Sequence, residues 1–250
     1  MNLIDVHCHL DICDDIEGVL ERAKASEVKK IITNGINLDS NKKALELSLK
    51  YPEIKSAIGL YPIDALSLNE KEINEIISFI KGNSDKIIAI GEVGLDFKED
   101  DKQHERQKEI FKIMIKLSKD LDKPIIVHSR RAEKECIEIL EEMQVKKVIM
   151  HCFSGRKNLI ARIVANKWFI SVPTNAKYSR QFQQMAYDAP LTQIFCETDS
   201  PFLHPDKLKN NEPSFIIESY KIIAAKKGIS LQEVSEIIER NYNKLFSHEN

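Results

Sequence analysis

The 250-residue sequence has five cysteines but no C-x-x-C pair. That absence excludes zinc ribbons and thioredoxin-type redox sites, which depend on this spacing. No apolar run approaches the roughly 20 residues that cross a membrane. Met1 is followed by polar Asn2 and acidic Asp5, without the basic and apolar regions of a signal peptide. We therefore expect a cytoplasmic protein with reduced thiols and no membrane partner.

Two phosphate-binding motifs and a strong net charge are also missing. The sequence contains neither G-x-G-x-x-G after its first apolar segment nor G-x-x-x-x-G-K-[ST]. A dinucleotide-binding fold is therefore disfavoured, and a P-loop nucleotide hydrolase is excluded. The 37 Lys and Arg residues nearly balance the 39 Asp and Glu residues, for a formal charge of -2. Any contact with nucleic acid would therefore depend on a local patch and not on an overall cationic field.

Short apolar segments alternate with longer amphipathic segments along the whole chain. Apolar segments without polar alternation are typical of parallel strands that are buried on both faces. The expected strands are 3–9, 30–36, 55–60, 87–96, 124–129, 147–153, 168–172 and 193–200. The expected helices are 14–25, 39–50, 69–82, 102–120, 132–143, 156–166, 179–186, 214–227 and 231–246. Asp39 and Asn69 are expected N-caps, and Gly82 an expected C-cap.

This alternation fits two architectures, an open doubly wound sheet and a closed (β/α)8 barrel. Eight strands in 250 residues favour the barrel. We therefore predict an α/β fold in which residues 1–250 form a single TIM-like barrel domain.

The first chemical signal is the pair His7 and His9. Residues two apart in a strand point to the same face, so both imidazoles should project together at the end of the first strand. Such a pair can chelate Zn²⁺ or a similar divalent ion. The alternative is a pair of core histidines with ordinary hydrogen bonds. The end of a barrel strand favours the metal site, because barrel enzymes carry their catalytic residues there.

Glu92 follows four apolar residues and should be buried. A buried carboxylate needs a cation, a hydrogen-bond donor or a proton. Its two oxygens can bridge two metal ions, and an ion pair with Arg or Lys is the alternative.

Two more histidines and an aspartate complete the predicted metal site. His128 and His151 each come directly after an apolar strand core, on consecutive strands. Asp199 ends the last strand, which lies beside the first strand in a closed barrel, so Asp199 should approach His7 and His9. Asp199 is the predicted general base. The cofactor we expect is a pair of divalent ions, either Zn, Mn, Co or Mg.

These residues lie in blocks that resemble the TatD-type metal-dependent hydrolases of the amidohydrolase-like barrels. The blocks, in family order, are Asp5 to Leu10, Gly91 to Asp96, Pro124 to Arg130, His151 to Gly155, Glu197 to Pro201 and Asn211 to Pro213. The resemblance implies a metal-dependent deoxyribonuclease, often a 3′→5′ exonuclease on DNA and sometimes active on RNA. It also implies that His7, His9, Glu92 and Asp199 hold one metal, and that Glu92, His128 and His151 hold the other.

The sequence departs from the family in one block. Where the family usually has G-[IL]-H-P-H, this chain has Tyr61 and Ile63 in place of the two histidines. Tyr61 is predicted to stack on a base or donate to a phosphate, with loop packing as the alternative. Three further substrate contacts are predicted. Arg130 is expected to bind a phosphate oxygen; the alternative is a salt bridge with Glu133 or Glu135. Ser154 is expected close to the metal ligands, which it would help to orient, and the same is expected of Ser200. His204 is expected either at the substrate or exposed without function.

Three functions fit this sequence. The leading hypothesis is a phosphodiesterase that acts on DNA ends. Its expected partner is single-stranded or end-containing DNA, with RNA as a second candidate and no obligate protein partner. The second is hydrolysis of an amide or ester in a small metabolite. The third is a non-catalytic metal-binding barrel, which the complete set of six ligands disfavours.

Overall fold

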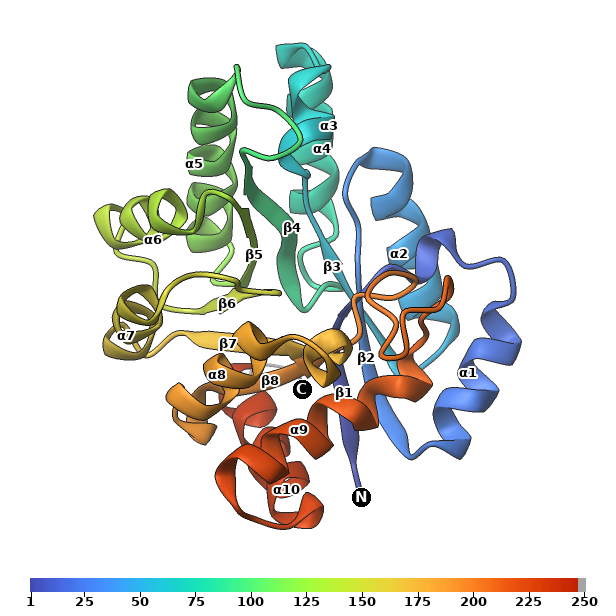
Figure 1. Cartoon of the computed structure of the whole chain (residues 1–250). Helices are drawn as coiled ribbons and strands as arrows, with labels where there is room; N and C mark the ends of the chain where they lie inside the picture. The colour runs from blue at the N-terminus through green and yellow to red at the C-terminus, as the bar shows by residue number, and fades with distance from the viewer. Residues whose placement is uncertain (247–250) are drawn as a thin grey trace.

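The computed structural model describes residues 1–246, in which eight parallel strands form one sheet in chain order from β1 to β8 (Figure 1). The strands are β1 (Leu3–Cys8), β2 (Val28–Asn34), β3 (Ile54–Ile58), β4 (Ala89–Asp96), β5 (Ile125–Arg130), β6 (Val148–Met150), β7 (Phe169–Pro173) and β8 (Ile194–Glu197). Every residue of β1, β4, β6, β7 and β8 is buried, as expected for strands covered on both faces. The predicted (β/α)8 barrel is confirmed.

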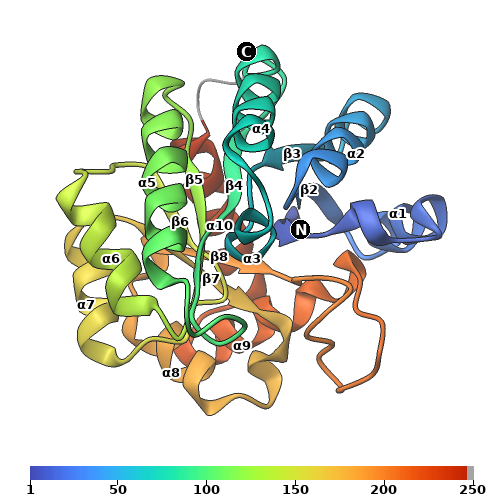
Figure 2. The ribbon, with the colours of Figure 1, turned by 90° about the horizontal axis from the view of Figure 1, so that it is seen from above.

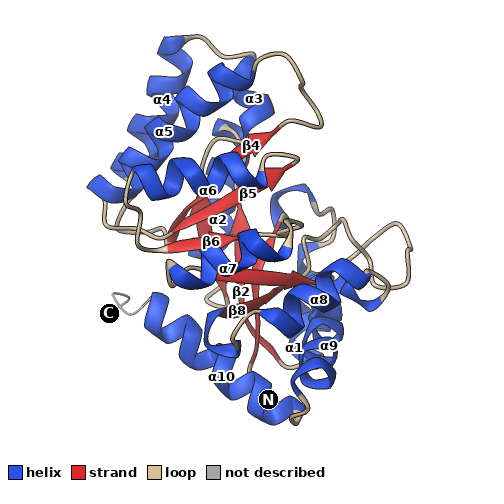
Figure 3. Ribbon diagram, turned by 60° about the vertical axis from the view of Figure 1, so that its left-hand side comes forward, coloured by secondary structure: helices blue, strands red, loops and turns tan. Residues whose placement is uncertain are grey.

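Helices connect successive strands, two more follow β8, and together they cover the outside of the barrel (Figures 2 and 3). They are α1 (Ile16–Ala25), α2 (Leu38–Lys50), α3 (Pro62–Leu66), α4 (Glu70–Gly82), α5 (His104–Asp120), α6 (Glu133–Glu142), α7 (Lys157–Ala165), α8 (Arg180–Asp188), α9 (Ile217–Lys227) and α10 (Leu231–Leu245). Their buried residues recur at three- and four-residue steps, such as Ile73, Ile76 and Ile80 in α4. No helix within residues 1–246 is long and apolar enough to cross a membrane.

The observed helix caps match the predicted caps in part. Asn69 caps α4 through a capping box, as predicted. The N-cap of α2 is Asn37 and not Asp39, because the Asn37 side chain accepts the hydrogen bond from the Ser40 backbone NH. Gly82 is the last residue of α4, one residue before the C-cap. The short helix α3 was not expected, because five residues are too few to show a helical period.

The barrel closes between β1 and the segment that follows β8. The backbone NH of Asp199 donates to the carbonyl of His7 at 2.9 Å, and that of His9 donates to the carbonyl of Ser200 at 2.7 Å. The last strand itself is short, so this seam is made by residues beyond its end. The seam brings residues from the two ends of the sequence to the same edge of the barrel.

Candidate active site

The six predicted metal ligands meet at the C-terminal ends of the strands. His7 lies in β1, Glu92 in β4 and His128 in β5. The other three lie just beyond strands: His9 and His151 are the first residues after β1 and β6, and Asp199 is the second residue after β8. The parallel sheet places all these ends at one edge, which is where barrel enzymes hold their sites.

A first group of donor atoms lies around His7 and His9. The Nε2 atoms of both histidines lie 3.6 Å from Oδ1 of Asp199. The same two atoms lie 3.4 Å from Oε2 of Glu92. Four donors with such spacing fit around one ion, since ligands about 2.1 Å from a metal lie about 3–3.5 Å from one another.

A second group of donor atoms lies around the other oxygen of Glu92. Oε1 of Glu92 lies 2.8 Å from Nδ1 of His128 and 3.1 Å from Nε2 of His151. The two imidazole nitrogens lie 3.2 Å apart. Glu92 therefore directs one oxygen to each group. The rings of His7 and His151 stack with centroids 3.8 Å apart, which keeps the two groups adjacent.

Three of the four histidines use their outer nitrogen in a hydrogen bond away from these groups. Nδ1 of His9 lies 3.0 Å from the carbonyl of Asn34, and Nε2 of His128 lies 2.9 Å from Oδ2 of Asp96. Nδ1 of His151 lies 3.3 Å from Glu197. Such partners fix the ring and leave the inner nitrogen available as a ligand. Glu197 is itself held by the Ser171 hydroxyl at 2.6 Å.

The electrostatics of the cluster fit a cation. Burial acts to raise the pKa of Glu92, but the surrounding histidines, His151 first, hold that pKa well below its usual range. Burial acts to lower the pKa of His9, but the Asp199 and Glu92 carboxylates outweigh it and raise the pKa to about 10. Burial lowers the pKa of His7, whose two ring nitrogens have no hydrogen-bond partner among residues 1–246. A neutral, unpartnered imidazole beside two carboxylates is the donor set that a divalent ion requires.

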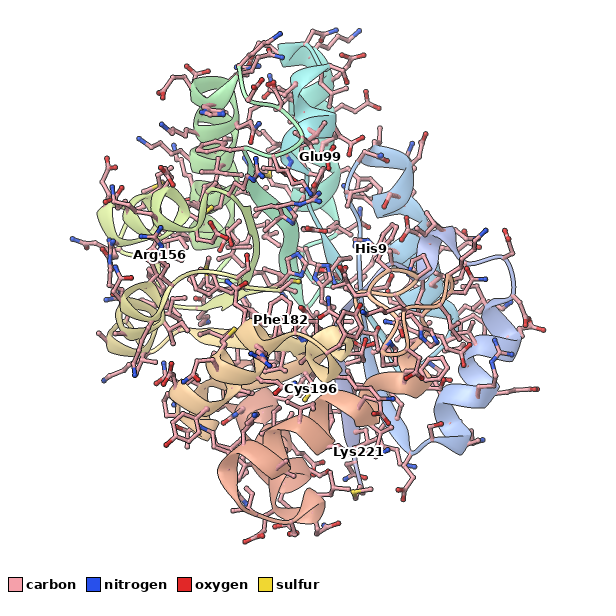
Figure 4. The ribbon with its side chains drawn as sticks, in the orientation of Figure 1. His9, Glu99, Arg156, Phe182, Cys196 and Lys221 are labelled. Carbon is pink, nitrogen blue, oxygen red and sulfur yellow. The ribbon has the colours of Figure 1, made fainter. Side chains whose placement is uncertain are left out.

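A cavity of about 630 Å³ opens above the two groups. Its size is typical of small-molecule sites, which range over about 300–1,000 Å³. Its floor is polar, and its wall carries apolar side chains that include Ile12, Phe182 and Phe202. Phe202 is 54% exposed, and its ring lies edge-on to His9 with centroids 6.1 Å apart. In Figure 4 the labelled His9 and Phe182 lie near the middle of the barrel, whereas Arg156 lies toward its outer helices.

The predicted substrate contacts differ in their surroundings. Arg130 lines the cavity, but its guanidinium is paired with Glu99 at 2.7 Å and not with Glu133 or Glu135. Ser154 also lines the cavity, and its hydroxyl donates to Glu133 at 2.7 Å.

The other predicted polar residues are also placed. Tyr61 lines the cavity, and its hydroxyl donates to Asp96 at 2.8 Å. His204 is buried against Phe215, with ring centroids 4.6 Å apart, so the expected exposure is wrong. The Ser200 hydroxyl is buried without a hydrogen-bond partner among the described residues.

Sequence reasoning missed three residues at the site. Asp96 and Glu197 orient ligands, and Phe202 forms the mouth. Asp96 carried a signal, because it stands four residues after Glu92 in one strand and a strand places such residues on the same face. Glu197 stands two residues before Asp199 and carried a similar signal. An exposed phenylalanine carries none, because its exposure depends on the fold.

A parallel eight-stranded barrel with clustered histidines and carboxylates at the ends of its strands defines a metal-dependent hydrolase. Residues 4–247 match the family described as TatD related DNase, and the chain belongs to this family.

Similar proteins and a similar solved structure agree with this family assignment. The chain is 36% identical to deoxyribonuclease TATDN3 of Homo sapiens, with 98% of this chain and 95% of the relative covered. It is 34% identical to the uncharacterized metal-dependent hydrolase YabD of Bacillus subtilis, with 98% of each covered. The crystal structure of YJJV, a TatD homolog from Escherichia coli K12, superposes with a TM-score of 0.93 at 26% identity, and 98% of each chain is covered.

Proposed function

We propose that this hydrolase holds two divalent ions and cleaves phosphodiester bonds at DNA ends in the 3′→5′ direction. The observation that carries the proposal is Glu92, whose two oxygens face separate donor groups. His7, His9 and Asp199 would complete one metal site, and His128 and His151 the other. The ions are Zn, Mn, Co or Mg, since mixed imidazole and carboxylate sites accept each of them. When bound, they would polarise water and balance the charge that develops on a phosphoryl group.

The chain's own residues supply the proton transfer. Oδ1 of Asp199 lies at the edge of the cavity, close to both His7 and His9. We assign it as the general base that accepts the proton of the attacking water. That water forms the new P–O bond, while the bond from phosphorus to the neighbouring sugar oxygen breaks and the sugar oxygen leaves as a hydroxyl with the proton that Asp199 had accepted. Glu92 would keep the two metal sites at a fixed separation.

The wall of the cavity suits a nucleotide. Arg130 reaches the cavity and would bind a phosphate oxygen in exchange for its exposed partner Glu99. Phe202 offers a half-exposed ring beside His9, on which a terminal base would stack. Tyr61 and Ser154 also line the cavity, and both remain predicted contacts of the bound DNA.

A digestion assay tests the proposal. The protein is stripped with a chelator, reloaded with Mn²⁺, Zn²⁺, Co²⁺ or Mg²⁺, and given single- and double-stranded DNA labelled at either end. We expect mononucleotides released from the 3′ end of single-stranded DNA by the reloaded protein only. Asp199→Asn is the matched control for a contaminating nuclease. Hydrolysis of amide or ester metabolites without cleavage of DNA would overturn the proposal in favour of a small-molecule hydrolase.

A further inference from the structure

Tyr61 is joined to the metal ligand His128 through one carboxylate oxygen. Oδ2 of Asp96 accepts the Tyr61 hydroxyl at 2.8 Å and lies 2.9 Å from Nε2 of His128. The hydroxyl is itself 3.4 Å from that nitrogen, and the two rings meet edge to face with centroids 5.0 Å apart. Tyr61 therefore contacts both the His128 ring and the acceptor that orients it.

Asp96 is fixed on its other side. Its Oδ1 accepts the backbone NH groups of Lys98 and Glu99, each at 2.9 Å. The Gln107 side chain bonds both the NH and the carbonyl of Asp96, at 2.8 and 3.1 Å. With Oδ1 held in this way, Oδ2 is the oxygen that faces other side chains: it bonds Tyr61 and His128, and the Arg130 guanidinium lies 3.9 Å from it.

The position of Oδ2 decides which nitrogen of His128 faces the second donor group. With Nε2 bonded to Asp96, Nδ1 points at Glu92 and His151. An imidazole flipped by half a turn would present a carbon atom in place of a donor. An acceptor on the outer nitrogen prevents that flip and raises the basicity of the inner nitrogen.

We propose that Tyr61 is a positioning residue, whose hydroxyl holds Oδ2 of Asp96 so that His128 presents Nδ1 to a divalent ion. This inference rests on the proposed function, because it takes His128 as a ligand. Tyr61 thereby acts on the metal site of Glu92, His128 and His151 and leaves the site of His7 and His9 alone. A tyrosine is suited to this task, since its hydroxyl reaches Asp96 from the segment that follows the neighbouring strand β3 while its ring packs beside His128.

Tyr61→Phe tests the inference by removing one hydroxyl and keeping the ring. Metal-free protein is titrated with Co²⁺, whose affinity and stoichiometry are followed by calorimetry and whose visible absorption reports the ligand geometry. We expect one of two Co²⁺ ions to bind roughly 10–100-fold more weakly, the usual effect of losing an outer partner of a ligand. Its absorption bands should change, while the other ion binds as in the wild type. Tyr178→Phe removes a hydroxyl from a tyrosine that does not line the cavity and should match the wild type.

Combination with Asp96→Asn sharpens the test. If Tyr61 acts through Asp96, the double variant should bind Co²⁺ no more weakly than Asp96→Asn alone. Wild-type binding and absorption in Tyr61→Phe would overturn the inference. Equal weakening of both ions with a lower thermal midpoint would assign Tyr61 to packing and would also overturn it. A wild-type protein that takes up no Co²⁺ would overturn this inference together with the proposed function.

Discussion

The carboxylate of Asp5 accepts two hydrogen bonds from Thr198, a residue 193 positions away in the chain. The Thr198 backbone NH donates to Oδ1 at 3.0 Å, and its hydroxyl donates to Oδ2 at 2.6 Å. Both residues are fully buried, so the pair joins β1 to the segment after β8 inside the molecule. The seam that carries Asp199 to His7 therefore depends on a side chain as well as on the backbone.

Asp5→Ala should destabilise the metal-free protein. The change leaves a buried NH and hydroxyl without an acceptor, which costs about 1–3 kcal/mol for such a group. Urea unfolding of metal-free protein measures the change in the free energy of unfolding. Glu46→Ala, at a carboxylate on the exposed face of α2, is the control and should stay within about 0.5 kcal/mol of the wild type. An Asp5→Ala protein as stable as this control would show that the backbone bonds alone close the barrel.

Glu92→Ala should lose both metal ions. Each oxygen of Glu92 faces one donor group, so its removal leaves both groups short of a carboxylate. Elemental analysis after dialysis gives the number of ions per chain, and digestion of labelled DNA gives activity. Retention of one ion at wild-type affinity would mean that Glu92 serves a single site.

Asp199→Asn should abolish hydrolysis while the fold is kept. Asp199 has a φ of 55°, in the left-handed region, where Asn is tolerated far better than Ala. The variant therefore removes the charge without adding backbone strain. Turnover on DNA with saturating metal is measured beside the far-ultraviolet circular dichroism spectrum. Wild-type turnover would rule out Asp199 as the general base.

Removal of the metal should lower the thermal midpoint. Binding to the folded state alone contributes about 2.7 kcal/mol when the free ion is at 100 times its Kd. For a chain of this length that corresponds to roughly 5–10 °C. Differential scanning calorimetry with excess chelator and with Mn²⁺ or Zn²⁺ measures the shift. Identical midpoints in chelator and in each metal would argue against a buried ion site.

Phe202→Ala should weaken binding of single-stranded DNA by roughly 1–3 kcal/mol, the usual contribution of one stacked base. The ring is half exposed at the mouth of the cavity, so its loss should leave stability nearly unchanged. Fluorescence anisotropy on the metal-free protein measures binding without cleavage. Leu208→Ala, at another exposed apolar side chain, is the control. Hydrolysis of methyl p-nitrophenyl phosphate should be unaffected, because that substrate carries no base; an equal loss on both substrates would contradict stacking.

Much of this site could be predicted from the sequence, because its ligands follow buried strands. The apolar segments predicted the positions at which the strands end, and parallel strands end at the same edge of the barrel. His7, Glu92 and His128 were therefore expected to lie close together. The two-residue period of a strand placed His7 and His9 on one face. The barrel itself followed from the alternation of apolar and amphipathic segments, with errors of a few residues at the ends of elements.

The tertiary structure alone decided the partners of these residues. Arg130 pairs with Glu99 and not with a neighbour on α6, and His204 is buried against Phe215. Both outcomes depend on the conformation of loops, which the periodicity of the sequence does not predict. The bond from Tyr61 to Asp96 joins the start of α3 to the end of β4, and it forms only when these two elements pack together. Local sequence dictates the direction of a side chain within its own strand or helix. The distance between two side chains from different elements is fixed only when the whole core packs.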